Sequence, residues 1–470
     1  MITKRKDKLT KRNFERMNRD LTRGPVIRSM LAFALPMLLG NLLQQCYNIA
    51  DTLIVGQFLG RNALAAVGSS FTLMTFLTSI LLGLCMGSGV VFSIRFGGRD
   101  EAGLCESVHT SFVLIAAAAA LMNLAAFALL DWMRVFLRVP AEVWGDMRAY
   151  LAVIFCGIAA TFLYNYCASF LRAVGNSVVP LAFLFVSAAL NIALDLWFIL
   201  SLRRGVRGAA EATVIAQYVS ALGIAGYVWR RYPQLRAAKR PARLRMRCVR
   251  EIARYSVLTC VQQSVMNLGI LMVQGLVNSF GATIMAAFAA AVKIDAFAYM
   301  PVQDFGNAFS TFIAQNYGAG QQRRIREGLR GAVLVAVGFS AAVSAAVWVF
   351  AQPLMALFVG ASETEIVREG VRYLHIEGLF YCGIGCLFLL YGLYRALGRP
   401  GMSVVLTVVS LGTRVALAYL LSSVPAIGVI GIWWSVPIGW FLADAVGWIY
   451  YAFRKDSLPG LAARECDRFD

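Results

Sequence analysis

The chain contains a series of apolar segments, each long enough to cross a lipid bilayer as a helix. Runs of about 20 or more mainly apolar residues recur along its 470 positions, and one helical crossing needs about 20. Inside a bilayer no water satisfies the backbone N–H and C=O groups, so each crossing segment must be an α-helix. Only 15% of the residues are charged, against about 25% in soluble domains. The sequence therefore excludes a soluble or disordered chain and predicts an all-α membrane protein.

We predict twelve membrane-spanning helices. Basic residues test this count, because Lys and Arg concentrate in the cytoplasmic segments that flank membrane spans. If the N-terminus is placed in the cytoplasm, three-quarters of the 44 Lys and Arg fall on the cytoplasmic side. This bias predicts a multi-pass protein of the cytoplasmic (inner) membrane with both termini in the cytoplasm. The predicted spans cover residues 29–54, 62–86, 109–130, 149–171, 178–200, 208–229, 253–277, 282–314, 331–352, 373–394, 401–422 and 427–452.

The two halves of the chain resemble each other. Leu171–Gly175 (LRAVG) matches Tyr394–Gly398 (YRALG), and the pair at 44–45 (QQ) matches the pair at 262–263 (QQ) at a similar separation. A series of such matches predicts a duplicated six-helix unit. Because six is even, both halves enter the membrane from the same side, and two such bundles enclose a central cleft. The predicted domains are a basic cytoplasmic N-terminal tail (1–28), an N-lobe with spans one to six (29–229), a basic cytoplasmic linker (230–252), a C-lobe with spans seven to twelve (253–454) and a cytoplasmic C-terminal tail (455–470).

The rest of the composition argues against several other functions. The net charge of +19 comes from residues that flank spans, and the basic stretches lack the interleaved aromatic residues of nucleic-acid readers. Ten Cys without a CxxC pair and only two His do not predict a zinc or iron–sulfur site. The sequence has no P-loop, no hydrolase motif and no repeated Gly-rich filter loop. We therefore expect no enzyme activity, no cofactor, no nucleic-acid partner and no direct use of ATP.

Acidic residues inside the predicted spans are the candidates for function, because a charge at the centre of a membrane helix costs roughly 2.5–3.5 kcal/mol. Asp195 lies deep in the fifth span, and Asn191 lies one turn earlier on the same helix face. Asp51 ends the first span, with Tyr47 and Asn48 one turn before it. Carboxylate and amide oxygens favour a hard cation such as Na⁺, and close carboxylates favour a shared proton because they resist joint ionisation.

The repeat provides a control for this cluster. Thr213, early in the sixth span, adds a hydroxyl oxygen to it. At the positions equivalent to Asn191, Asp195 and Thr213, the second half has Arg414, Ala418 and Val436. Residues that only pack helices together would keep a similar chemical type in both halves. An acidic cluster in one half alone therefore predicts a functional specialisation of that half.

Other ionisable residues inside spans are secondary candidates. Asp295 and Asp304 lie on the eighth span, where Lys293 has the charge to pair with either of them. Glu377 lies on the tenth span and Arg414 on the eleventh.

Pro36 lies inside the first span. Proline lacks a backbone N–H and clashes with the preceding turn, so we expect it to bend the helix that carries Asp51.

Four of these motifs are similar to those of the multidrug and toxic compound extrusion (MATE) transporters. They are residues 47–51 (YNIAD), 172–175 (RAVG), 191–195 (NIALD) and 208–213 (GAAEAT). The likeness extends over nearly the whole chain and favours the bacterial and archaeal branch that has an acidic cation site in the N-lobe. It implies a V-shaped pair of six-helix lobes that export organic, often cationic, compounds, driven by inward Na⁺ or H⁺.

The resemblance also implies roles for individual residues. The cation or proton site of the N-lobe would consist of Asp51, Asn191, Asp195 and Thr213, with Na⁺ as the candidate metal. Its wall would include Asn165, Tyr47 and Asn48, and Pro36 falls where the first helix of the family bends. Other branches carry a carboxylate on the seventh span, where this chain has Gln262, Gln263 and Asn267 but no acid.

These observations predict a secondary active multidrug efflux antiporter that exchanges organic compounds for inward H⁺ or Na⁺. We expect it to function as a monomer, with small-molecule organic substrates and membrane lipids as its partners. The alternative is a lipid-linked oligosaccharide flippase of the same superfamily, which needs cationic groups for pyrophosphate. Arg414 and Lys293 keep that alternative open. The sequence leaves the natural substrate and the choice of coupling ion open.

Overall fold

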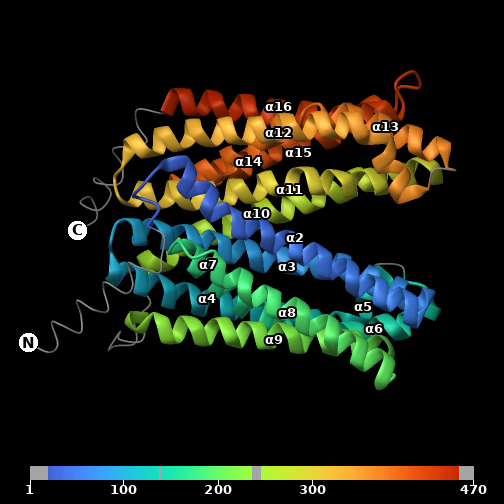
Figure 1. Cartoon of the computed structure of the whole chain (residues 1–470), viewed down its shortest axis with the longest axis horizontal. Helices are drawn as coiled ribbons and strands as arrows, with labels where there is room; N and C mark the ends of the chain where they lie inside the picture. Colours follow the sequence, from blue (N-terminus) through green and yellow to red (C-terminus); the bar gives the residue numbers. More distant parts are fainter. Residues whose placement is uncertain (1–19, 137–138, 236–244, 361–362, 455–470) are drawn as a thin grey trace, which may run out of the picture. The chain divides into compact units, whose positions relative to one another are not determined.

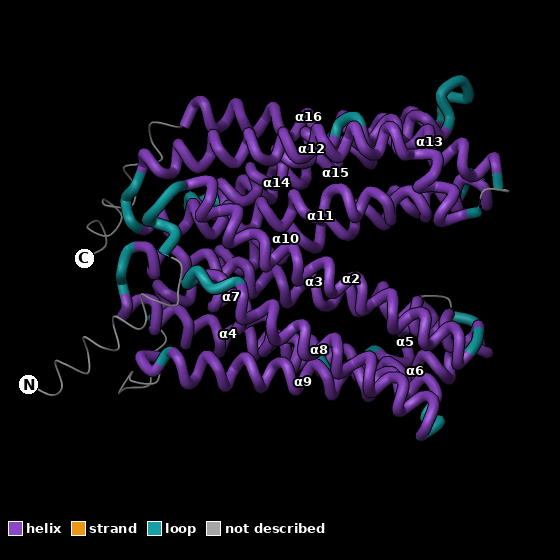
Figure 2. Tube along the Cα trace, viewed as in Figure 1, coloured by secondary structure: helices purple, strands orange, loops and turns teal. Residues whose placement is uncertain are grey.

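All regular secondary structure in the described part of the protein is helical. The computed structural model describes residues 20–136, 139–235, 245–360 and 363–454, and within these ranges the regular elements are helices, with no strand (Figure 2). Most of the predicted N-terminal tail, part of the predicted linker and the whole predicted C-terminal tail lie outside the described residues. The helices are α2 (Val26–Leu59), α3 (Arg61–Gly97), α4 (Glu101–Ala128), α5 (Leu130–Phe136), α6 (Ala141–Cys156), α7 (Ile158–Ala173), α8 (Val178–Leu196), η1 (Trp197–Ser201), α9 (Gly205–Arg231), η2 (Pro233–Leu235), α10 (Met246–Asn278), α11 (Ala282–Gly318), α12 (Gln322–Val359), α13 (Thr364–Gly378), α14 (Tyr381–Ala396), α15 (Pro400–Ser422) and α16 (Val429–Arg454).

The count of membrane spans agrees with the sequence. Ten helices among the described residues are long and apolar enough to cross a membrane, and two bent helix pairs bring the number to twelve if each pair is one span. The bent pairs are α6 with α7, at 44°, and α13 with α14, at 52°. The prediction of an all-α membrane protein is confirmed, but the predicted spans 149–171 and 373–394 each contain a break.

The break between α6 and α7 has a local cause. The Gly157 N–H donates to the Ile154 carbonyl at 2.8 Å, which tightens the turn. A Cβ at Gly157 would lie 2.7 Å from Gln217 Oε1 on α9, so glycine lets α9 pack against the break. The second half breaks at the equivalent place, where the Phe380 N–H donates to the Glu377 carbonyl at 3.0 Å. The duplication therefore preserves the bend.

The chain forms two compact units. Unit 1 contains Leu35–Phe96 and Asp100–Cys260, and unit 2 contains Leu21–Ala34, Gly97–Arg99 and the chain from Val261 onward. In unit 1, α9 packs against α6, α7 and α8 (Figure 1). In unit 2, α14 packs against α11, α12, α15 and α16. Two helices contribute to both units: α2 changes unit beside Pro36, and α10 changes unit after Cys260.

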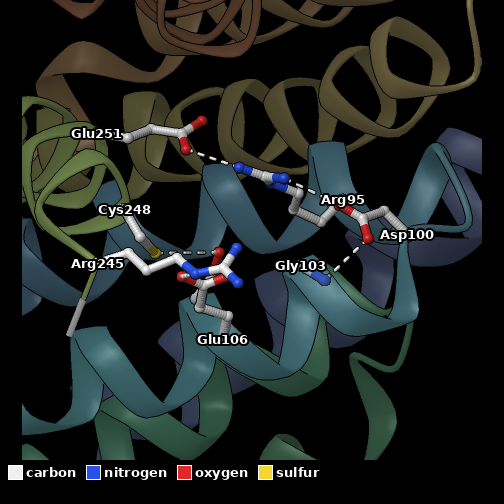
Figure 3. A network of polar contacts seen from close by, with 8 residues as sticks. Arg95, Asp100, Gly103, Glu106, Arg245, Cys248 and Glu251 are labelled. Atoms are coloured by element: carbon white, nitrogen blue, oxygen red, sulfur yellow. Dashed lines mark hydrogen bonds and ion pairs between the residues drawn. The ribbon is translucent and has the colours of Figure 1, made fainter. Parts of the chain in front are cut away.

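Polar contacts attach the first turns of α10 to the rest of unit 1 (Figure 3). The Arg95 guanidinium joins Asp100, at 2.9 Å, to Glu251 on α10, at 2.8 Å. Asp100 also caps α4 by accepting the Gly103 N–H at 2.8 Å. These side chains are about one-third exposed or more, and partly exposed ion pairs contribute only up to about 1 kcal/mol each. The network therefore fixes the register of α10 more than it stabilises the unit.

Close backbone packing is the stronger attachment of α10. A Cβ at Gly87 of α3 would lie 2.5 Å from Ser256 Cα, and one at Gly83 would lie 2.6 Å from Cys260 Cα. Small residues four apart let two membrane helices approach to backbone contact. Unit 2 has an attachment of its own, in which the Arg324 guanidinium donates to the carbonyls of Leu21 and Gly24, just before α2.

Replacing Gly87 with Ala is expected to lower the thermal stability of the protein in detergent. The added Cβ would force α3 and α10 apart, and overpacking of this kind costs about 1–3 kcal/mol. The melting temperature can be followed by tryptophan fluorescence. Gly68→Ala is the matched control on the same helix, because a Cβ there meets nothing within 4 Å. Equal melting temperatures for the two variants would refute the close packing.

Candidate functional site

Asp195 occupies a buried position near the end of α8. Its side chain is 0% exposed, and that of Asn191, one turn earlier, is 2% exposed. The opposite face of this segment points outward, since Leu196 and Trp197 are exposed. Directly after Asp195 the helix continues as the π-helical segment η1, a geometry often found at functional sites. The local sequence thus directs two polar side chains inward from an otherwise apolar helix.

A hydrogen bond joins α8 to α9 at this point. The Asn191 amide Nδ2 donates to Thr213 Oγ1 at 3.2 Å, and Thr213 Oγ1 donates to the Ala209 carbonyl at 3.0 Å. The amide is thereby oriented so that Asn191 Oδ1 is left without a hydrogen-bond partner. An oriented amide oxygen beside a carboxylate is a ligand arrangement that suits a hard cation.

Asp51 completes the cluster from α2. It is half-buried, and its carboxyl group interacts electrostatically with that of Asp195. Both Asp195 oxygens and Asp51 Oδ1 are buried without a hydrogen-bond donor. The structure therefore brings Asp51, Asn191, Asp195 and Thr213 together from three helices.

Two tyrosines lie against the acid pair. Tyr47 on α2 and Tyr150 on α6 both interact electrostatically with Asp51 and Asp195. Sequence reasoning found Tyr47 but missed Tyr150, which is 8% exposed. The repeat held a signal, because the Tyr-Leu pair at 150–151 recurs as Tyr373 and Leu374. Both tyrosines can donate a hydroxyl to a carboxylate or contribute an oxygen to a cation.

The remaining predicted wall residues are not joined to the cluster by a hydrogen bond. Asn165 on α7 donates its amide to the Thr161 carbonyl of its own helix at 2.8 Å. Asn48 is half-buried on α2, and its carbonyl accepts from Thr52 Oγ1 at 2.8 Å. Among the described residues, neither of these two side chains forms a hydrogen bond with an acid of the cluster.

Three of the five secondary candidates, Asp295, Glu377 and Arg414, form a different cluster in unit 2, while Asp304 is buried farther along α11. Asp295 on α11 and Glu377 on α13 are each 3% exposed and interact with each other, and Arg414 on α15 acts on both. The Tyr381 hydroxyl donates to Asp295 Oδ1. Lys293 is exposed and forms no ion pair with either neighbouring acid in the described structure. Lys293 and Asp295 are two residues apart, and side chains at this spacing point to different faces of a helix. This explains why the two do not form an ion pair although they are close in sequence.

The acid pair of unit 1 is chemically suited to reversible cation binding. Within the described residues no basic side chain forms an ion pair with Asp51 or Asp195, and four oxygens of the cluster lack hydrogen-bond donors. Buried unpaired carboxylates are costly unless a proton or a cation neutralises them. Among the described residues, no group of three or more His, Cys, Asp or Glu is placed so that it could hold a metal ion.

Comparison with known proteins identifies the family. The MatE family model matches the chain twice, over residues 36–197 and 257–420, which is more than half of its length. The chain belongs to the MatE family. One MatE match falls in each half of the chain, as expected for a duplicated unit.

Similar proteins cover nearly all of this MatE chain. It is 28% identical over 437 residues to the probable multidrug resistance protein YpnP of Bacillus subtilis, with 93% of this chain and 97% of that protein covered. It is 26% identical over 407 residues to the FAD transporter of Shewanella oneidensis, with 82% and 86% covered. A solved structure of a MOP superfamily transporter from Pyrococcus furiosus superimposes with a TM-score of 0.87 at 24% identity, covering 93% of this chain and 98% of that one. That likeness shows the fold.

Asp195→Asn is expected to raise the melting temperature of the purified protein in Na⁺-free buffer at mildly alkaline pH. The substitution removes a fully buried carboxyl group without a hydrogen-bond donor among the described residues, which in this buffer must either ionise in an apolar site or hold a proton that the solution favours releasing. Relief of that cost stabilises a protein by about 1 kcal/mol or more. Asp131→Asn is the control, since Asp131 is exposed in its ion pair with Arg148 and should change stability by less than about 0.5 kcal/mol. A lower melting temperature for Asp195→Asn would show that the charge already has a stabilising partner.

Proposed function

We propose that this protein is a secondary active multidrug efflux antiporter. It exports organic, often cationic, compounds in exchange for inward H⁺ or Na⁺, and it belongs to the branch that couples through the N-lobe, here unit 1. The observation that carries the proposal is the pair Asp51 and Asp195, which has buried oxygens without hydrogen-bond partners and no base beside it among the described residues. Membership of the MatE family and the similarity to YpnP support the transport of drugs.

In this mechanism the coupling ion and the substrate exclude each other. A proton or Na⁺ neutralises the acid pair, with Asn191 and Thr213 oxygens available to a metal ion. Neutralisation alters the packing of α2, α8 and α9 around the acid pair, and it removes the negative charge that attracts a cationic substrate. The change in charge of the acid pair then accounts both for release of the substrate on one side of the membrane and for release of the ion on the other.

Pro36 gives α2 a place to bend during this cycle. Its missing N–H leaves the helix with one hydrogen bond fewer, at the point where α2 passes from one compact unit to the other. We propose that Asp51, farther along α2, transmits ion binding to that point. The protein would work as a monomer in the cytoplasmic membrane, with both termini inside and with surrounding lipid as its other partner.

The flippase alternative has less support. Two of the relatives, which cover 93% and 82% of the chain, carry the names of a probable multidrug resistance protein and an FAD transporter. The FAD transporter also shows that substrate chemistry varies among relatives, so organic cations are the class to test first and an organic anion the second.

Asp195→Asn is expected to abolish gradient-driven transport while leaving a folded protein. The test uses proteoliposomes, ethidium as the fluorescent organic cation, and a H⁺ gradient or a Na⁺ gradient imposed separately. Wild-type transport under one gradient identifies the coupling ion, and Asp131→Asn should transport like the wild type because its side chain is exposed and distant in sequence from the cluster. Undiminished coupled transport by Asp195→Asn would overturn the assignment of the site.

Thr213→Val is expected to raise the ion concentration for half-maximal transport roughly fivefold, the equivalent of about 1 kcal/mol for one lost hydrogen bond. The Thr213 hydroxyl orients Asn191, and valine keeps the side-chain shape without the oxygen. Thr213→Ser keeps the hydroxyl and should behave like the wild type. If Val and Ser variants have the same ion dependence, the hydroxyl has no part in ion binding.

A further inference from the structure

Unit 2 contains a second buried acid pair that the transport mechanism above does not use. Asp295 and Glu377 come from α11 and α13, and each is 3% exposed. The Tyr381 hydroxyl on α14 donates to Asp295 Oδ1, and Tyr373 on α13 interacts with both acids. Asp295 Oδ2 has no hydrogen-bond partner. Two carboxyl groups at this depth cannot both ionise unless positive charge compensates them.

Arg414 supplies that positive charge. Its guanidinium acts electrostatically on both Asp295 and Glu377, and in an apolar interior such a charge acts over a longer distance than in water. Its Nε atom is buried and has no hydrogen-bond partner. Arginine keeps its proton at every physiological pH, so this charge is permanent.

The two acid pairs occupy related places in the duplicated architecture. Tyr150 beside the unit 1 pair and Tyr373 beside the unit 2 pair are separated by the same number of residues as Asn191 and Arg414, and as the two copies of the RA(V/L)G motif. The acids themselves come from different helices, α2 and α8 in unit 1 but α11 and α13 in unit 2. At the position where unit 1 has the neutral amide of Asn191, unit 2 therefore has the positively charged Arg414.

Charge balance separates the two sites. The unit 1 pair has no base beside it in the described part of the chain, so it becomes neutral by taking up protons or other cations. The unit 2 pair, with Arg414 nearby, reaches a net charge of zero with a single proton shared between its carboxyls, one cation fewer than the unit 1 pair needs. The other groups facing this pair are the tyrosines 299, 373 and 381, which are neutral when protonated.

We propose that Arg414 is a tethered cation that takes, in unit 2, the place of an exchanged one. The coupling ion then binds in unit 1 alone, and a neutral residue at position 414 converts the pair Asp295 and Glu377 into a second binding site for a small monovalent cation, H⁺ or Na⁺. The inference rests on the proposed function only in treating unit 1 as the exchange site.

The test measures cation binding directly, without transport. Purified protein in detergent is assayed with radioactive Na⁺ and, separately, for proton uptake from weakly buffered solution after a pH step. All variants carry Asp195→Asn, which is expected to remove binding in unit 1. Adding Arg414→Gln is expected to restore roughly one bound cation per molecule, at least about tenfold above the Asp195→Asn background. Adding Arg414→Lys, which keeps the positive charge, should restore none.

A third substitution locates the restored cation. Adding Glu377→Gln to the Asp195→Asn, Arg414→Gln protein should remove it, because one carboxyl of the pair is gone. Failure of a folded Asp195→Asn, Arg414→Gln protein to bind either cation would overturn the proposal. So would equal binding by the Gln and Lys variants.

Wild-type protein provides a second test that does not depend on the folding of the Arg414 variants. Glu377→Gln alone should leave cation binding unchanged, because Arg414 and Asp295 remain balanced. Loss of the bound cation in that variant would mean that unit 2 is already an exchange site, and would overturn the proposal. If neither Asp195→Asn nor Glu377→Gln lowers cation binding, the proposed unit 1 site is wrong. The effect of Arg414→Gln is then measured as the increase in bound cation above the amount that Asp195→Asn binds.

Discussion

The need to balance buried negative charge governs both halves of this protein. Each unit holds two acids in an apolar interior, where an uncompensated carboxylate is far more costly than in water. Among the described residues, no base lies beside Asp51 and Asp195 in unit 1, whereas Arg414 lies beside Asp295 and Glu377 in unit 2. In the proposed mechanism, cations from outside the protein meet this requirement entirely in unit 1, whereas in unit 2 Arg414 supplies one of the two positive charges.

The bilayer imposes a second constraint, since every backbone polar group in a span must find a partner within the protein. The broken pairs α6–α7 and α13–α14 satisfy it with tight turns at their breaks. Each pair also carries a tyrosine, Tyr150 or Tyr373, to the acids of its unit. Both halves of the duplicated chain have the bend and the tyrosine, whereas their acids lie on different helices. The helix geometry is therefore more alike between the two halves than the positions of the charged residues.

Hydropathy and repetition predicted most of the fold because each crossing must be about 20 residues of apolar helix. The association of Asp195 with Asn191 and Thr213 was predictable from helix periodicity and from the asymmetry of the repeat. Tyr150 was missed because one tyrosine among 17 has no distinguishing local pattern, and only its recurrence as Tyr373 in the second half marks it. The pairing of Asp295 with Glu377 could not be predicted, since it joins helices that are distant in sequence. Lys293, which is near Asp295 in sequence, was instead considered as its partner.

Helix α2 connects these constraints to a structural change. Asp51 lies on the part of α2 that belongs to unit 1, while Leu21–Ala34 belongs to unit 2, where Arg324 binds the backbone just before the helix. A continuous helix transmits displacement along its axis unless its hydrogen-bond ladder is interrupted, and Pro36 interrupts it close to the transition between units. In the proposed cycle, neutralising Asp51 changes the forces on one side of that weak point while Arg324 holds the other. A charge change of one proton or one Na⁺ is then converted into bending at a single position rather than distributed along the helix.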